Sequence, residues 1–264
     1  MTGARHSMYG PGPFKEYVKN GLICWWDGID NAGPGLHSSN TGTWKNLGSL
    51  GSAYDATRSY RNTYWEDNAA RFDASYCFLT PNYLMSSHMK GEWTVEAVFT
   101  PDSGWFRTYR GVFGDHSSAG KGLIGLQYGG STIGNGVYQQ GSGAGDKATM
   151  MLRSSAFSGG NIYHVSFVGS KTGVSFKIYI NATEVTSSSP SYSSRTGPSS
   201  GDNLVLTSTH GFCIGSAMGS RASDSARNYS GKIHCVRVYN RAISEPEIVS
   251  NYKIDGRRFG GPTS

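Results

Sequence analysis

Short segments in which apolar and polar residues alternate recur along this chain, and they constrain its fold more than any other feature. In residues 93–99, Trp93, Val95, Ala97 and Phe99 occupy every second position. A period of two is typical of a β-strand with one face buried. We expect strands at residues 21–27, 75–80, 93–99, 110–114, 121–128, 132–138, 147–153, 163–167, 174–181, 203–207, 210–215 and 230–240.

Stretches rich in glycine and serine separate these segments, as in residues 141–145 and 187–201, which we interpret as turns and loops. The chain has 37 glycines in 264 residues, 12% aromatic residues and only 16% charged residues. Disordered chains and coiled coils are poor in aromatic residues and richer in charge. The sequence therefore predicts an all-β protein in which two antiparallel sheets pack into a β-sandwich.

The two ends of the chain differ from this pattern. Residues 1–20 are polar and contain Gly-Pro-Gly-Pro at 10–13, so we interpret them as an N-terminal arm and residues 21–260 as one domain. Ser244, Pro246 and Glu247 have the spacing of a helix N-terminus with a capping box. One short C-terminal helix is expected there, with Ile248, Val249 and Tyr252 as its apolar face and Asp255-Gly256 as its end.

Charge and cysteine content restrict the class of partner. The net charge is +6, but the basic residues are scattered, which disfavours nucleic-acid binding. No apolar run is long enough to span a membrane, and the N-terminus does not resemble a signal peptide. The four cysteines lie far apart in apolar segments, so we expect buried free thiols and no zinc site; they are Cys24, Cys77, Cys213 and Cys235.

Residues 229–248, YSGKIHCVRVYNRAISEPEI, carry a resemblance to a known family. They are similar to the closing signature of concanavalin A-like, laminin-G-type jelly-roll domains, F-x-G-x-I-D-E-V-R-I-Y-N-R-A-L-S-x-x-E-I. Phe72-Asp-Ala-Ser75 and residues 93–99 resemble other strands of that family, and the likeness covers about residues 21–258. The chain departs from the pattern at His234-Cys235, where the family has Asp-Glu. Residues 21–30 and 251–259 resemble a subgroup found in gut phages and prophages.

The resemblance implies a jelly roll that binds or cleaves carbohydrate. Glycosidases need two carboxyl groups within about 10 Å of each other. Glu92 and Glu96 are the nearest candidates, but four strand residues separate them by about 13 Å, so we interpret Glu96 as structural. Gly211-x-Cys213-x-Gly215 matches a nucleophile elbow in form, yet a loop follows it instead of a helix. We therefore expect no catalytic residue.

Binding is the better hypothesis, because sugars are held by aromatic faces and a few placed polar groups. Residues of these types lie on expected loops and strand ends between 105 and 139. The candidate ligand-binding residues are Trp105, Arg107, Tyr109, Arg110, Asp115, His116, Tyr128, Tyr138 and Gln139. The same residue types also fill sandwich cores and protein interfaces, and that alternative stays open.

A second set of polar residues, Asp27, Asp30 and Asn31, lies in a glycine-rich loop. Oxygen ligands at this spacing could hold Ca²⁺, the one cofactor that the sequence suggests. Asp and Asn are also ordinary turn residues that bond to their own backbone, and we favour the turn.

Together these observations predict a non-catalytic recognition or adhesion module. The subgroup resemblance implies a phage virion protein, as a capsid decoration or a tail-associated component, on the virion or another extracellular surface. Its expected partners are glycans of the host cell surface or mucus, and other virion proteins through residues 1–20. Two alternatives remain: a structural virion protein that contacts only neighbouring subunits, and a carbohydrate-active enzyme of the same fold.

Overall fold

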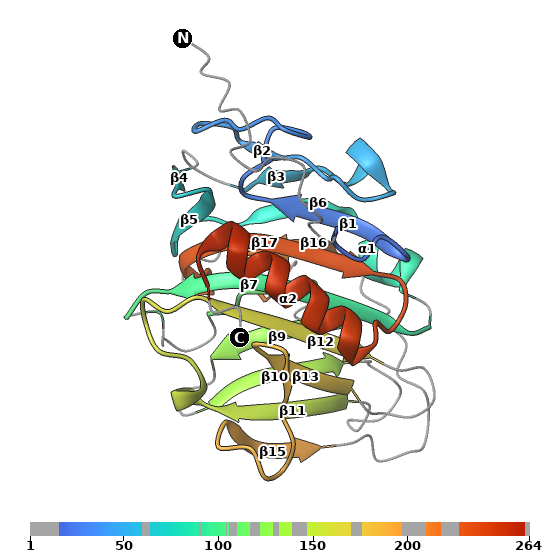
Figure 1. Ribbon diagram of the computed structural model, residues 1–264, viewed down its shortest axis with the longest axis vertical. Helices are drawn as coiled ribbons and strands as arrows, with labels where there is room; N and C mark the ends of the chain where they lie inside the picture. Colours follow the sequence, from blue (N-terminus) through green and yellow to red (C-terminus); the bar gives the residue numbers. More distant parts are fainter. Residues whose placement is uncertain are drawn as a thin grey trace.

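Two antiparallel β-sheets form the body of the protein in the computed structural model (Figure 1). The structure describes residues 16–59, 64–89, 91–103, 105, 110–116, 122–128, 132–138, 147–169, 176–196, 210–217 and 227–261. The first sheet has eight strands in the order β14 (Thr183–Glu184), β13 (Phe176–Ile180), β12 (Tyr163–Gly169), β7 (Trp93–Pro101), β17 (Ser230–Tyr239), β5 (Ala69–Asp73) and β4 (Tyr64–Glu66), with β1 (Leu22–Asp27) also paired to β17.

The second sheet has nine strands. Their order is β15 (Tyr192–Thr196), β11 (Lys147–Arg153), β10 (Thr132–Tyr138), β9 (Gly122–Tyr128), β8 (Phe113–Gly114), β16 (Gly211–Ile214), β6 (Phe78–Asn82), β3 (Ala56–Arg58) and β2 (Thr43–Trp44). Two α-helices, α1 (Leu84–His88) and α2 (Glu245–Phe259), and two short 3₁₀ turns, Gly51–Tyr54 and Ser154–Ala156, complete the described elements.

The structure confirms the predicted all-β sandwich, and β10 and β11 have the predicted bounds. The short strands β2, β3, β4, β5 and β14 were not predicted, because two to five residues carry too little alternation to detect. Strand β15 lies in the stretch 187–201, which we interpreted as loop; its residues Tyr-Ser-Ser-Arg-Thr pair with β11 through the backbone. The predicted strand 203–207 lies outside the described residues.

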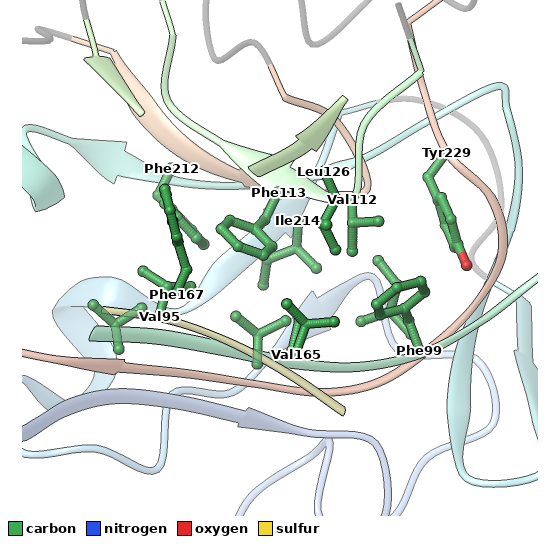
Figure 2. Close-up of a cluster of buried hydrophobic side chains, with 14 of the residues drawn as sticks. Val95, Phe99, Val112, Phe113, Leu126, Val165, Phe167, Phe212, Ile214 and Tyr229 are labelled. Carbon is green, nitrogen blue, oxygen red and sulfur yellow. The ribbon is translucent and has the colours of Figure 1, made fainter. Parts of the chain in front are cut away.

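Aromatic and branched side chains from both sheets meet in the core (Figure 2). Val95 and Phe99 of β7 are buried there with Phe113 and Phe212 of the other sheet. The predicted inward face of β7 is therefore confirmed. The alternate residues of β7 are buried as well, including Thr94 and Glu96, because helix α2 covers the outer side of this sheet.

Helix α2, red in Figure 1, lies across the eight-stranded sheet. Ser244 and Glu247 form the predicted capping box. The predicted end at Asp255-Gly256 is wrong: the helix continues to Phe259, and Gly260 ends it with a φ of 79°. Gly256 weakens a helix without breaking it, whereas the left-handed conformation at Gly260 stops it.

The N-terminal segment Glu16–Asn20 also belongs to the folded unit. The Tyr17 hydroxyl donates to Asp255 Oδ1 at 2.6 Å, and the Val18 amide donates to Asn251 Oδ1 at 3.1 Å. Because Tyr17 is buried, the folded unit includes residues that we assigned to the arm. Residues 1–15 lie outside the described residues.

All four cysteines are buried free thiols, as predicted. In the part of the chain that the structure describes, no helix is both long and apolar enough to cross a membrane.

Candidate functional site

A cluster of charged residues lies under α2, on the middle strands of the outer face of the eight-stranded sheet. Arg237 is at its centre and is fully buried. Its Nε donates to Glu96 Oε2 at 2.8 Å and its Nη1 to Asp255 Oδ1 at 2.9 Å. Glu96 also accepts from the Asn251 amide and the Ser166 hydroxyl, at 2.8 and 3.0 Å. This charged cluster joins strands β7, β12 and β17 to the helix.

The electrostatics of this charged cluster fit an anchoring role. Burial alone would raise the pKa of Glu96, but the Arg237 guanidinium and His164 beside it lower that pKa to about 2. Glu96 is therefore an ionised carboxylate whose oxygens already have partners. Its burial under α2 supports the structural interpretation of Glu96.

The outer face of the nine-stranded sheet is different in character. Strand register places one continuous row of residues across it, through all nine strands. Along each strand, the residue of this row lies next to a core residue such as Phe78, Phe113 or Ile214. Because successive side chains of a strand point to opposite faces, the row points away from the core. Its members with described side chains are uncharged: Thr43, Thr57, Leu79, Cys213, Gly114 and Thr149. Thr57 is exposed and Thr43 and Leu79 are half-buried, whereas Cys213, Gly114 and Thr149 are buried, so the row is accessible only in part.

A second outward row crosses strands β9, β10, β11 and β15. Gly134 pairs with Gln127 on one side and Met151 on the other, and Met151 pairs with Ser194. Gln127 and Met151 are half-buried, and Ser194 is exposed. Leu126 precedes Gln127 with a φ of 56°, at an irregularity in the pairing of β9 with β10. This bulge is what turns Gln127 outward while Leu126 stays in the core.

The candidate face is defined as the part of this outer face that is formed by β8, β9, β10, β11 and β15. Four of the predicted ligand-binding residues lie at its strand ends and are described. The Tyr128 amide donates to the Arg110 carbonyl at 2.8 Å, which joins the loop before β8 to the end of β9. Asp115 and His116 follow β8 directly. The backbone of Arg110 is therefore close to that of Tyr128, but the half-buried ring of Tyr128 packs against the core.

Asp115 and His116 have mainly structural surroundings. Asp115 is fully buried, and its Oδ1 accepts the Leu123 amide at 2.7 Å, so it pairs β8 to β9. Burial and the nearby charge of Arg227 lower the pKa of His116 to about 4. His116 is therefore a neutral imidazole at pH 7, able to hydrogen-bond without carrying charge.

Trp105 lies in the core, which corrects the expectation that it stacks on a sugar. Its side chain is fully buried. Its ring centroid lies 5.5 Å from that of Tyr229 and 6.5 Å from those of Phe99 and Phe157. A ring that stacks on a sugar needs one face open to solvent, whereas the ring of Trp105 is enclosed by core side chains.

The remaining predicted ligand-binding residues cannot be placed in full. Arg107, Tyr109 and Gln139 lie outside the described residues. Tyr138 ends β10, where its backbone pairs with Gly122 and Lys147. It therefore belongs to a strand of the candidate face.

The loop proposed for Ca²⁺ is held by protein groups. Asp27 Oδ1 accepts from the Ile29 amide at 2.9 Å, and Asp27 Oδ2 accepts from Arg258 Nη2 at 2.8 Å. Asn31 exchanges two hydrogen bonds of 2.8 Å with the backbone of Ser38, while Asp30 Oδ2 lies 3.7 Å from Arg258 Nη2. These contacts are those of the turn interpretation. Within the described ranges, no three His, Cys, Asp or Glu side chains form a group suited to a metal.

Sequence reasoning missed Gln127, Met151 and Ser194. Alternation alone could not find Gln127, because the bulge at Leu126 changes which residues of β9 face outward. Met151 is apolar and sits between core residues in sequence, so only the register with Gly134 shows its direction. Ser194 lies on the strand interpreted as loop.

Comparison with known proteins identifies the family of this chain. The sequence profile described as the concanavalin A-like lectin/glucanases superfamily matches residues 71–249. A search of curated proteins finds no match.

Solved structures with a similar fold include proteins that bind carbohydrate. A Trypanosoma rangeli sialidase in complex with sialic acid is 15% identical at a TM-score of 0.56, over 91% of this chain and 34% of the sialidase. Domain 4 of an extracellular arabinanase from Geobacillus stearothermophilus, in complex with arabinotriose, is 15% identical at a TM-score of 0.55, over 89% of this chain and 99% of that domain. The receptor-binding domain of botulinum neurotoxin C/D mosaic serotype is 11% identical at 0.54, over 93% and 55%. The chain spans about a third of the sialidase, and at these identities the likeness shows the fold.

Proposed function

Because the chain belongs to the concanavalin A-like lectin/glucanases superfamily, we propose that it is a carbohydrate-binding module whose ligand lies on the candidate face. The observation that carries this proposal is the contrast between the two outer faces. The middle of one is covered by α2 and the charged cluster around Arg237, whereas the other presents the half-buried Gln127 and Met151 and the exposed Ser194, with the exposed Arg153 at the end of β11.

The chemistry of the candidate face suits a sugar. Gln127 and Ser194 supply an amide and a hydroxyl, while Met151 supplies an apolar surface between them. Sugar rings combine hydroxyl groups with apolar faces, so they match a surface that is neither strongly charged nor fully apolar. Gly134 has no side chain, so it adds no bulk between Gln127 and Met151 in this row.

Two of the similar structures support this proposal. The similarity covers 99% of the arabinanase domain, which was solved with arabinotriose; the sialidase was solved with sialic acid. We extend carbohydrate binding, and no particular sugar, from them to this protein.

We further propose that binding takes place without cleavage. The buried carboxylates Glu96 and Asp255 share Arg237 under α2, on the sheet opposite the candidate face. They are therefore on the wrong side of the sandwich to act on a ligand held there.

The setting that we propose is a phage virion surface, with residues 1–15 as the link to neighbouring virion proteins and glycans of the host cell or mucus as the ligand.

A glycan array probed with the purified full chain tests the proposed function. We expect the protein to retain a defined set of glycans and to leave them uncleaved. The set should be the same in Ca²⁺ and in chelator, because Arg258 and the loop backbone already bind the carboxylate oxygens of Asp27. A blank array in both buffers would contradict carbohydrate binding and would favour a structural virion protein. Loss of the signal in chelator alone would favour a Ca²⁺ site.

A further inference from the structure

Two of the four cysteines lie against each other on the outer side of the nine-stranded sheet. The Sγ atoms of Cys77 and Cys213 are 3.1 Å apart, and both residues are fully buried. Cys213 is in β16, and Cys77 immediately precedes β6, the strand that pairs with it. A disulfide bond is about 2.05 Å long, so the two sulfurs need to approach by only about 1 Å.

The other two cysteines have no such arrangement. Cys24 is packed in the core between the sheets, whereas Cys235 lies under α2, with its sulfur 3.6 Å from Arg237 Nη1. They belong to the paired strands β1 and β17 but lie on opposite faces of that sheet. Cys24 is opposite Val238, three residues from Cys235. Only Cys77 and Cys213 therefore have the geometry for a bond.

We propose that Cys77 and Cys213 are a disulfide site, which closes as the chain folds in the presence of a thiol oxidant such as oxidised glutathione. Two S–H bonds break and one S–S bond forms; the two electrons and two protons reduce oxidised glutathione to two thiols. This inference does not depend on carbohydrate binding.

Burial determines when the bond forms. The hydrogen bond with Cys77, followed by burial, raises the pKa of the Cys213 thiol well above its ordinary value. The thiolate is the reactive species, and it is scarce in the folded state. Oxidation is therefore fast during folding, while the thiols are accessible, and slow once both are enclosed.

The bond would connect positions 136 residues apart and tie β6 to β16 next to the candidate face. Closing so long a loop restricts the unfolded chain, and the midpoint of thermal unfolding should rise by about 10 °C relative to the reduced protein.

Peptide mapping gives a direct test, because each cysteine falls in its own tryptic peptide. Cys77 lies in 72–90, Cys213 in 196–221, Cys24 in 20–45 and Cys235 in 233–237. The full chain is refolded in a glutathione redox buffer, alkylated in denaturant, digested and weighed. We expect peptides 72–90 and 196–221 linked, with the other two alkylated as internal controls.

Two further samples keep the test decisive. The double variant Cys24→Ser/Cys235→Ser should form the same link, and Cys77→Ser should remove it together with the rise in melting temperature. Folded wild-type protein with all four cysteines alkylated, or with Cys77 or Cys213 linked to a different cysteine, would overturn the proposal.

Discussion

Replacing Arg237 by Ala should lower the free energy of unfolding by about 3–5 kcal/mol, the cost of removing one partner from a buried ion cluster. Arg237 is fully buried, and the change would leave the carboxylates of Glu96 and Asp255 without their shared counter-ion. Glu96 on β7 and Asp255 on α2 both face that guanidinium. Without it the two carboxylates repel each other, so the helix should pack less tightly on the sheet. Urea denaturation followed by circular dichroism measures the change.

The control for this variant is Lys177→Ala. Lys177 forms an ion pair of 2.9 Å with Glu184, but its side chain is 56% exposed, so the expected change is below about 1 kcal/mol. The low pKa of Glu96 gives a second readout. Its contribution to stability is complete above the ordinary pKa of 4.5 and is lost as the pH falls towards about 2. An Arg237→Ala variant no less stable than the control variant would contradict the anchoring role.

Replacing Trp105 by Ala should cost about 3–5 kcal/mol of unfolding free energy, because it opens a large cavity in the core. The indole is fully buried among Phe99, Phe157 and Tyr229. Trp105→Phe should cost less, since a smaller aromatic ring still fills part of the space. Thermal and urea unfolding of the two variants measure the effect.

Binding of an array-positive glycan separates a core role from a ligand contact at this position. Trp105→Phe should retain the affinity of the wild type if the indole only fills the core. Stable, fully folded Trp105→Ala protein that had lost binding would show that the residue contacts the ligand, contrary to its place in the structure.

Much of the fold could be predicted because local patterns and the final packing agree. The alternating apolar residues of β7 correctly predicted which of its faces is turned to the core, and Ser244 with Glu247 correctly predicted the start of α2. The helix end was wrong because Gly256 lies in a helix that tertiary packing holds together, with Asp255 bound to Arg237 beside it. The buried face of α2 is also more polar than the predicted stripe, since Asn251 and Asp255 face the charged cluster.

The candidate site was harder to predict, since it depends on register between strands far apart in sequence. Its aromatic type alone suggested Trp105 as a ligand contact, but its side chain is buried in the core. Gln127 reaches the outer face only because of a positive φ at Leu126, a conformation that the sequence gives no reason to expect. Met151 and Ser194 become neighbours only through the pairing of β11 with β15.

The measurement that tests the central claim most directly compares two matched variants in binding to the strongest glycan from the array. Met151→Arg places a long charged side chain on the candidate face, and Val249→Arg makes the same kind of change on α2, at another half-buried apolar position. With both variants folded, titration calorimetry should show at least about a tenfold loss of affinity for Met151→Arg. Val249→Arg should bind as the wild type does. Wild-type affinity in Met151→Arg, with the loss in Val249→Arg, would contradict a ligand on the nine-stranded sheet.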